Sequence, residues 1–311
     1  MAGPEGSTKA IAAAFGANTG IALAKFVGFL VTGSSALLAE SIHSVADASN
    51  QGLLFLGGRR ARRAPTTLHP FGYGRERYFW SFVVAIVLFL LGGVFSIYEA
   101  FHKIRDPHEI TSPIVAFAIL GVAMVFEAFA LRTAMREARP YLAGRGWIHY
   151  IRTSRSPELP VLLLEDSGAL LGLVFSSGGI ALALLTGNTV YDGIGTLAIG
   201  ILLVAIAAVL AFEMKSLLLG ESAAPEMAER IERELAQTRG VRRVLHLMTQ
   251  HMGPDDLLVA AALQLDPGLG GERLTRTLDD AERRIRAAVP IARLIYLEPD
   301  LPDEAPPEGG P

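Results

Sequence analysis

The chain has 311 residues, of which 51% are apolar and 19% are charged; its formal net charge is −3 and it contains no cysteine. Soluble domains carry roughly 25% charged residues, so this composition argues against a single water-soluble globule. The lack of cysteine excludes disulfide scaffolds, thiolate zinc sites, iron–sulfur clusters and cysteine nucleophiles, and the slightly acidic balance provides no basic surface for nucleic acid.

Six apolar stretches occupy the first two thirds of the chain, and each has about the 20 residues needed to cross a bilayer. They predict a transmembrane domain over residues 10–219, preceded by a short cytoplasmic N-terminus at 1–9. The first stretch contains Asn18 and Lys25, which a simple membrane anchor does not need. The predicted spans cover residues 10–32, 36–58, 78–101, 112–135, 160–185 and 189–212.

Basic residues are distributed very unevenly over the links between these spans. The links after the second and fourth spans hold twelve arginines, whereas the link after the third holds only Lys103 and Arg105. Positive charge accumulates on the cytoplasmic side, so both termini are predicted to be cytoplasmic. The first residues lack the charged and apolar regions of a targeting peptide, and we therefore expect the plasma (inner) membrane.

The last part of the chain has the pattern of a soluble domain. It predicts a helix over 225–238, strands over 241–250 and 257–266, a second helix over 272–289 and a last strand over 293–298. The order α-β-β-α-β indicates a ferredoxin-like (metallochaperone-like) α+β domain at 220–299, with helices on one side of a sheet. Residues 300–311 are rich in proline, glycine and acids and predict a disordered tail.

Ionisable residues inside predicted spans are the candidates for function, because a charge at the bilayer centre costs at least ~2.5 kcal/mol. His43 and Asp47 are four residues apart, which places both on one face of the second span. Imidazole nitrogen and carboxylate oxygen together suit zinc and its first-row neighbours. Zinc normally takes four ligands, so a second helix must contribute, and the fifth span offers Glu165 and Asp166.

Other polar residues in the spans have more than one interpretation. Glu165 is adjacent to Asp166 and therefore points about 100° away around the helix. It can be a fourth ligand, a group that orients a ligand or a hydrogen-bonding partner between helices. Asn50 and Gln51 are better explained as hydrogen-bonding partners between helices. A hydrated access path and structural polar contacts explain three further residues equally well: Asn18, Glu40 and Glu127.

Two motifs and the domain order resemble the cation diffusion facilitator family. The motifs are residues 39–47 (AESIHSVAD) and 69–75 (HPFGYGR), which accompany six spans and a soluble α-β-β-α-β tail. The match extends from about Ala10 to Glu298. The connector at 148–152 (IHYIR) and the segment at 164–166 (LED) resemble one branch of the family, that of the animal zinc transporter numbered nine.

The resemblance implies a homodimer that exports a divalent metal, usually zinc, in exchange for protons. It implies no enzyme activity, no catalytic residues and no resident cofactor; the metal is the transported substrate, and manganese, iron, cobalt and cadmium are alternatives to zinc. The implied partners are a second copy of the chain, the lipid bilayer, divalent cations and protons, and not nucleic acid.

The family's four-coordinate transport site corresponds to His43, Asp47 and Asp166, but its remaining position is Leu162, which cannot coordinate a metal. Glu165 or a water then completes the shell, or the protein supplies three ligands. The cytoplasmic metal cluster of the family falls on residues of which only Glu298 can ligate. We therefore expect the soluble domain to dimerise without that cluster.

The sequence is compatible with two other functions. A membrane-anchored metal sensor would bind metal and signal through the soluble domain without transport. A proton-coupled transporter of an organic cation would use the acids without coordinating a metal. An intramembrane hydrolase is disfavoured, because the chain has no H-E-x-x-H pair, no G-x-S-x-G segment and no cysteine.

Overall fold

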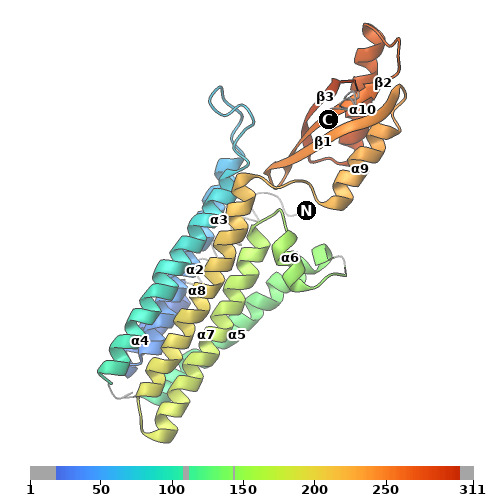
Figure 1. Ribbon diagram of the computed structural model, residues 1–311. Coiled ribbons are helices and arrows are strands. Elements are labelled where there is room, and N and C mark those ends of the chain that lie inside the picture. Colours follow the sequence, from blue (N-terminus) through green and yellow to red (C-terminus); the bar gives the residue numbers. More distant parts are fainter. Residues whose placement is uncertain (1–18, 108–111, 143, 302–311) are drawn as a thin grey trace, which may run out of the picture. The chain divides into compact units, whose positions relative to one another are not determined.

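The computed structural model describes residues 19–107, 112–142 and 144–301 (Figure 1). These residues fall into two compact units. One runs up to Arg60 and continues over Arg77–Lys215, and the other combines Ala61–Glu76 with the chain from Ser216 onward. The predicted N-terminus at 1–9, the first part of the first predicted span and residues 302–311 of the predicted tail lie outside the described residues.

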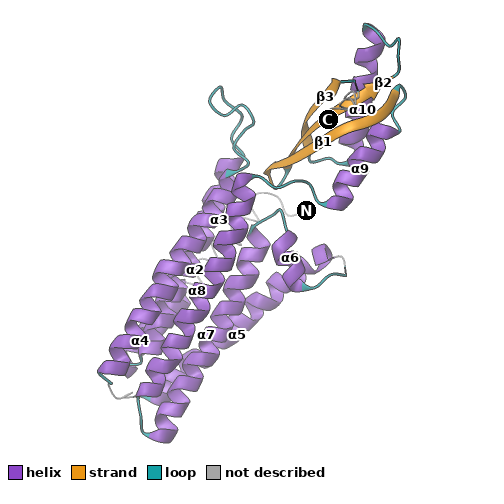
Figure 2. Ribbon diagram, in the orientation of Figure 1, coloured by secondary structure: helices purple, strands orange, loops and turns teal. Residues whose placement is uncertain are grey.

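Helices make up the first unit (Figure 2). Its first described helix is Thr19–Thr32, and a turn at Gly33 leads into α2. The third long helix is built from α3, the π-helical turn η1 and α4, which follow one another without a break. The bounds of these and the following elements of the unit are α2 (Ser35–Ala61), α3 (Glu76–Val87), η1 (Leu88–Val94), α4 (Phe95–Arg105), α5 (Pro113–Ala138), η2 (Arg139–Leu142), α6 (Trp147–Thr153), α7 (Glu158–Thr186) and α8 (Val190–Leu219).

Four helices of the described chain are long and apolar enough to cross a membrane: Glu76–Arg105, Pro113–Leu142, Glu158–Thr186 and Val190–Leu219. They correspond to the third to sixth predicted spans. The helix Thr19–Thr32 is shorter, since only part of the first predicted span is described. The 27-residue α2 is long enough, but it is less apolar because it carries the polar residues singled out in the sequence.

The helices of this unit pack through clusters of apolar side chains, whose close van der Waals contact favours their association. One cluster joins Leu88 of η1, Val161 of α7 and Leu203 of α8. A second joins Leu37 of α2, Leu120 of α5 and Leu173 of α7. Each cluster includes α7, so this helix is held on two sides.

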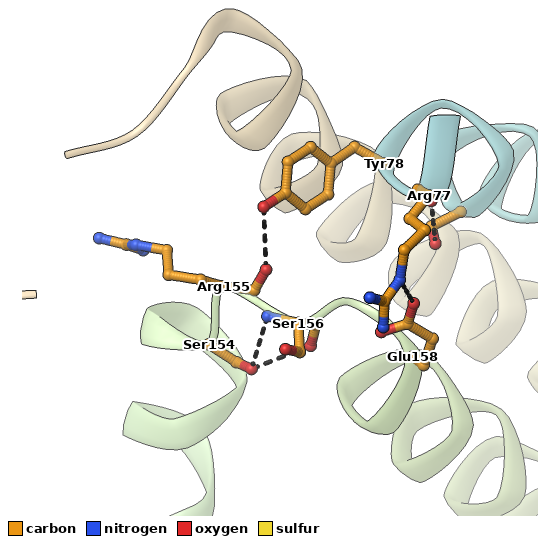
Figure 3. A network of polar contacts seen from close by, with 7 residues as sticks. Arg77, Tyr78, Ser154, Arg155, Ser156 and Glu158 are labelled. Carbon is orange, nitrogen blue, oxygen red and sulfur yellow. Dashed lines mark hydrogen bonds and ion pairs between the residues drawn. The ribbon is translucent and has the colours of Figure 1, made fainter. Parts of the chain in front are cut away.

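A polar network fixes the place where α7 begins (Figure 3). Arg77, next to the start of α3, forms an ion pair with Glu158, the first residue of α7. The buried Tyr78 donates a hydrogen bond from its hydroxyl to the carbonyl oxygen of Arg155, at 3.1 Å. The Ser154 hydroxyl donates to the carbonyl oxygen of Ser156 at 2.9 Å. The segment before α7 is thereby attached to α3.

The second unit contains a three-stranded sheet and two helices. Its elements are α9 (Pro225–Ala236), β1 (Val241–Gly253), β2 (Asp256–Leu265), α10 (Glu272–Ala288) and β3 (Ala292–Pro299), which confirms the predicted order. The sheet order is β1-β2-β3, with β1 antiparallel and β3 parallel to β2. Ile231 and Leu235 of α9 and Ile285 of α10 form one core with Leu257 and Val259 of β2.

The link between α2 and α3 also belongs to this second unit. Its Gly74 lies against the end of β1, where a Cβ atom added to Gly74 would come within 2.6 Å of the Met252 carbonyl oxygen. On the other side of the contact, a Cβ atom on Gly253 would come within 2.8 Å of the Gly74 Cα. Arg75 also approaches the sulfur of Met252, at 3.6 Å. Only glycine permits such a close approach of two backbones.

Candidate metal site

A cavity of about 520 Å³ lies in the helical unit and is bordered by α2, α5, α7 and Ile21 of the first described helix. Acidic side chains from three helices line it: Asp47 from α2, Glu127 and Glu137 from α5, and Glu165 and Asp166 from α7. The cavity therefore brings the predicted acids of the second and fifth spans to one space. Glu127 of α5 lines the same cavity.

His43 and Asp47 approach each other on α2 as the four-residue spacing predicts. The His43 Nε2 atom lies 3.5 Å from an Asp47 carboxylate oxygen. The imidazole is 1% exposed and is not part of the cavity lining, so it lies behind Asp47. Its Nδ1 faces Gly92 of η1, where an added Cβ would lie 3.8 Å away. Neither ring nitrogen of this buried imidazole has a hydrogen-bond partner.

Glu165 and Asp166 both line the cavity although they are adjacent in the sequence. Glu165 is buried, and one of its carboxylate oxygens accepts a hydrogen bond from the Asn50 side-chain amide of α2 at 2.6 Å. Asp166 keeps a buried oxygen without a hydrogen-bond partner, as does Asp47. Leu162 lines the same cavity and packs against the buried cluster around Ala134.

Close to this cavity lies an ion pair that the sequence alone did not reveal. Lys25 of the first described helix and Glu40 of α2 are both 0% exposed, and their charged groups are 3.1 Å apart. The Lys25 ammonium also donates a hydrogen bond to the Ser44 hydroxyl at 2.8 Å. The sequence marks Lys25 as unusual for an anchor, but no local spacing identifies its partner, because Lys25 and Glu40 lie on different helices.

The described part of the chain has no group of three or more His, Asp or Glu side chains already arranged around one point. Instead, α2 supplies the Asp47 carboxylate with the His43 imidazole beside it, and α7 supplies the Glu165 and Asp166 carboxylates. All three carboxylates line the same cavity. Buried acids without partners are costly, and they are retained where they bind ions or move protons.

Comparison with known sequences adds independent information. The cation efflux transmembrane domain matches residues 11–219, and the cation efflux protein cytoplasmic domain matches residues 223–300. The human "Proton-coupled zinc antiporter SLC30A9, mitochondrial" is 32% identical over 244 residues, which cover 78% of this chain and 43% of that protein. The chain thus spans less than half the length of this relative.

Two relatives of lower sequence identity have names that refer to metals. "Metal tolerance protein C4" of Arabidopsis thaliana is 27% identical over 84% of this chain and 57% of its own length. "Zinc transporter ZitB" of Escherichia coli (strain K12) is 27% identical over 74% of this chain and 70% of its own length. The two matched domains cover both units, and the resemblance seen in the sequence motifs is confirmed: the chain is an integral membrane protein of the cation efflux (cation diffusion facilitator) family.

Proposed function

We propose that this protein exports a divalent metal cation, with zinc as the main substrate, in exchange for protons. The observation that carries the proposal is the cavity in which carboxylates of α2 and α7 meet beside the buried His43. The printed names of two relatives, a proton-coupled zinc antiporter and a zinc transporter, support the choice of substrate and counter-ion. Manganese, iron(II), cobalt and cadmium remain alternatives.

The proposed ligands are His43, Asp47, Asp166 and Glu165. Glu165 takes the role that the resemblance would assign to residue 162, where Leu162 has no donor atom. Its first oxygen is held by the Asn50 amide, which leaves the second oxygen for a metal. Metal-bound carboxylates are typically oriented by such a hydrogen bond. Asn50 is then a group that positions Glu165, which is consistent with its predicted role between helices.

Exchange with protons follows from the chemistry of these ligands. A metal binds neutral imidazole and ionised carboxylates, so metal and protons compete for the same atoms. Metal arriving from the cytoplasm displaces protons, and protons arriving from the opposite side displace the metal. Metal affinity should therefore fall as the pH is lowered, by up to about tenfold per pH unit for each coupled proton. Rocking of helices around the site would expose it to each side in turn.

Assembly and membrane topology complete the proposal. The cytoplasmic domain match supports a homodimer held by the second unit. We propose six membrane spans, the first two being the helix that includes Thr19–Thr32 and α2, with both termini in the cytoplasm. The plasma (inner) membrane remains our proposed location, and the mitochondrial location belongs to the printed name of the relative SLC30A9.

The experiment is metal uptake by liposomes containing the purified full-length protein, tested with zinc, manganese, iron(II), cobalt and cadmium. Zinc uptake is expected for the wild type and is expected to disappear for Asp47→Asn. The matched control is Asp280→Asn, which changes an exposed carboxylate on α10 and should leave uptake unchanged. Zinc binding without uptake would instead favour a metal sensor. Uptake of an organic cation without metal dependence would favour the second alternative.

A further inference from the structure

The Lys25–Glu40 pair is an unusual element of a membrane helix bundle. Both side chains are completely buried, and Lys25 lies on a helix that is otherwise apolar. Removing two charges from water is costly, and their attraction repays this cost only when the geometry is good and further hydrogen bonds are made. The pair therefore gives little reason to expect added stability, and a role in the function of the adjacent cavity needs to be considered.

The position of the pair connects it to the proposed site. Glu40, Ser44 and Asp47 follow a spacing of four and three residues, which places them on one face of α2. The Lys25 ammonium binds the first two of these side chains. Ser44 itself lines the cavity, one helical turn from Asp47. The positive charge of Lys25 thus lies against the same face of α2 from which Asp47 reaches the cavity.

Lys25 is connected to the cavity through its partner Ser44. Ser44 lines the same cavity as the acids Asp47 and Glu127. Glu40 uses one oxygen for Lys25, while the other is buried without a hydrogen-bond partner against Gly172 of α7. A Cβ atom at residue 172 would come within 2.5 Å of this oxygen, so only glycine leaves room for the carboxylate.

We propose that Lys25 is a resident cation of the metal site, whose fixed positive charge weakens metal binding enough to permit release. The inference rests on the proposed function, because it takes the acids of the cavity as the metal ligands. Several carboxylates in a medium of low dielectric constant attract a divalent cation strongly. A transported ion must bind well enough to enter and weakly enough to leave. A lysine that cannot diffuse away provides this balance permanently.

The test is an equilibrium titration of the purified full-length protein with zinc, at constant pH and salt. Lys25→Met should bind zinc more tightly, by about tenfold for the loss of one nearby charge. Lys25→Arg keeps the charge and should bind zinc like the wild type. The matched control is Lys103→Met, which removes another buried lysine, one that donates to the Gly33 carbonyl oxygen at 3.4 Å. It should leave zinc affinity unchanged.

The direction of the change separates this role from a structural one. Damage to the fold weakens binding, whereas removal of a resident cation strengthens it. Unchanged or weaker zinc binding by folded Lys25→Met would overturn the proposal, and so would tighter binding by Lys25→Arg. A wild type that binds none of the metals would instead refute the proposed function, so the two failures are distinguishable.

Two further variants keep the test decisive if Lys25→Met does not fold. Glu40→Gln leaves the lysine without its anion, so its charge acts fully on the cavity and zinc binding should weaken by about tenfold. The double variant Lys25→Met/Glu40→Gln removes both charges and should bind zinc at least as tightly as the wild type. Zinc binding that is stronger in Glu40→Gln than in the double variant would contradict the proposal.

Discussion

The two units of this protein use charged residues in opposite ways. In the helical unit, the ionisable groups of Lys25, Glu40 and His43 are buried and face other helices. On α10 of the cytoplasmic unit, most charged residues are exposed, and several pair along the helix, as Arg276 does with Glu272. Exposed ion pairs of this kind stabilise the folded state by about 0.3–0.5 kcal/mol each. Burying a charge, in contrast, costs free energy because the charge loses its hydration.

The comparison shows where function should be sought. Surface charges on α10 can be changed with little consequence, because water and ions screen them. The buried ionisable groups near the cavity are not screened by water in this way, and the metal site that we propose would account for their presence.

Asp166→Asn should reduce zinc transport by about 100-fold or more, because the loss of groups that only support metal ligands already costs 10–100-fold. The measurement is the initial rate of zinc uptake into liposomes at equal protein incorporation. Transport at the wild-type rate would show that the unpartnered Asp166 oxygen is not part of the metal site.

Ile231→Ala should destabilise the cytoplasmic unit by about 2–5 kcal/mol, because it opens a hole in the core between α9 and the sheet. The expected result is faster hydrogen exchange in β2 of the full-length protein, without a change in exchange at α7. Equal protection of β2 in variant and wild type would contradict the assignment of this core.

Asn50→Ala should weaken zinc binding by about tenfold, since Glu165 keeps its carboxylate but loses the amide that orients it. Glu165→Gln should cause a larger loss, as expected for a ligand. The same titration measures both variants. If Glu165→Gln binds zinc as tightly as Asn50→Ala or more tightly, Glu165 is not a ligand and water completes the shell.

Arg286→Ala should change the free energy of unfolding by less than about 0.5 kcal/mol, because its pair with Glu282 is exposed on α10. Thermal unfolding of the full-length protein in detergent provides the measurement. A loss comparable to that of Ile231→Ala would contradict the comparison between buried and exposed groups.

Much of the fold follows from the sequence pattern, with differences mainly at the ends of helices. The order of elements in the cytoplasmic unit is as predicted. The sixth predicted span ends at 212, whereas α8 continues to Leu219. Hydropathy falls at the charged residues Glu213 and Lys215, but both are compatible with a helix. Hydropathy therefore marks the apolar part of the helix and not its end.

The candidate site was only partly predictable. The approach of His43 to Asp47 follows from spacing on one helix. Adjacent residues point about 100° apart around a helix, so the sequence does not predict that Glu165 and Asp166 reach the same space. Both nevertheless line the cavity. The Lys25–Glu40 contact depends on how two helices pack, and the pattern within either helix does not contain that information.

Proton movement that accompanies zinc entry tests the proposed exchange of metal for protons. Liposomes containing the full-length protein are loaded with a pH indicator and given a zinc gradient without a pH gradient. We expect a change of internal pH that follows zinc entry and is lost in His43→Ala and Asp47→Asn. Zinc entry without any proton movement, or an unchanged signal in both variants, would contradict the claim that these buried groups exchange metal for protons.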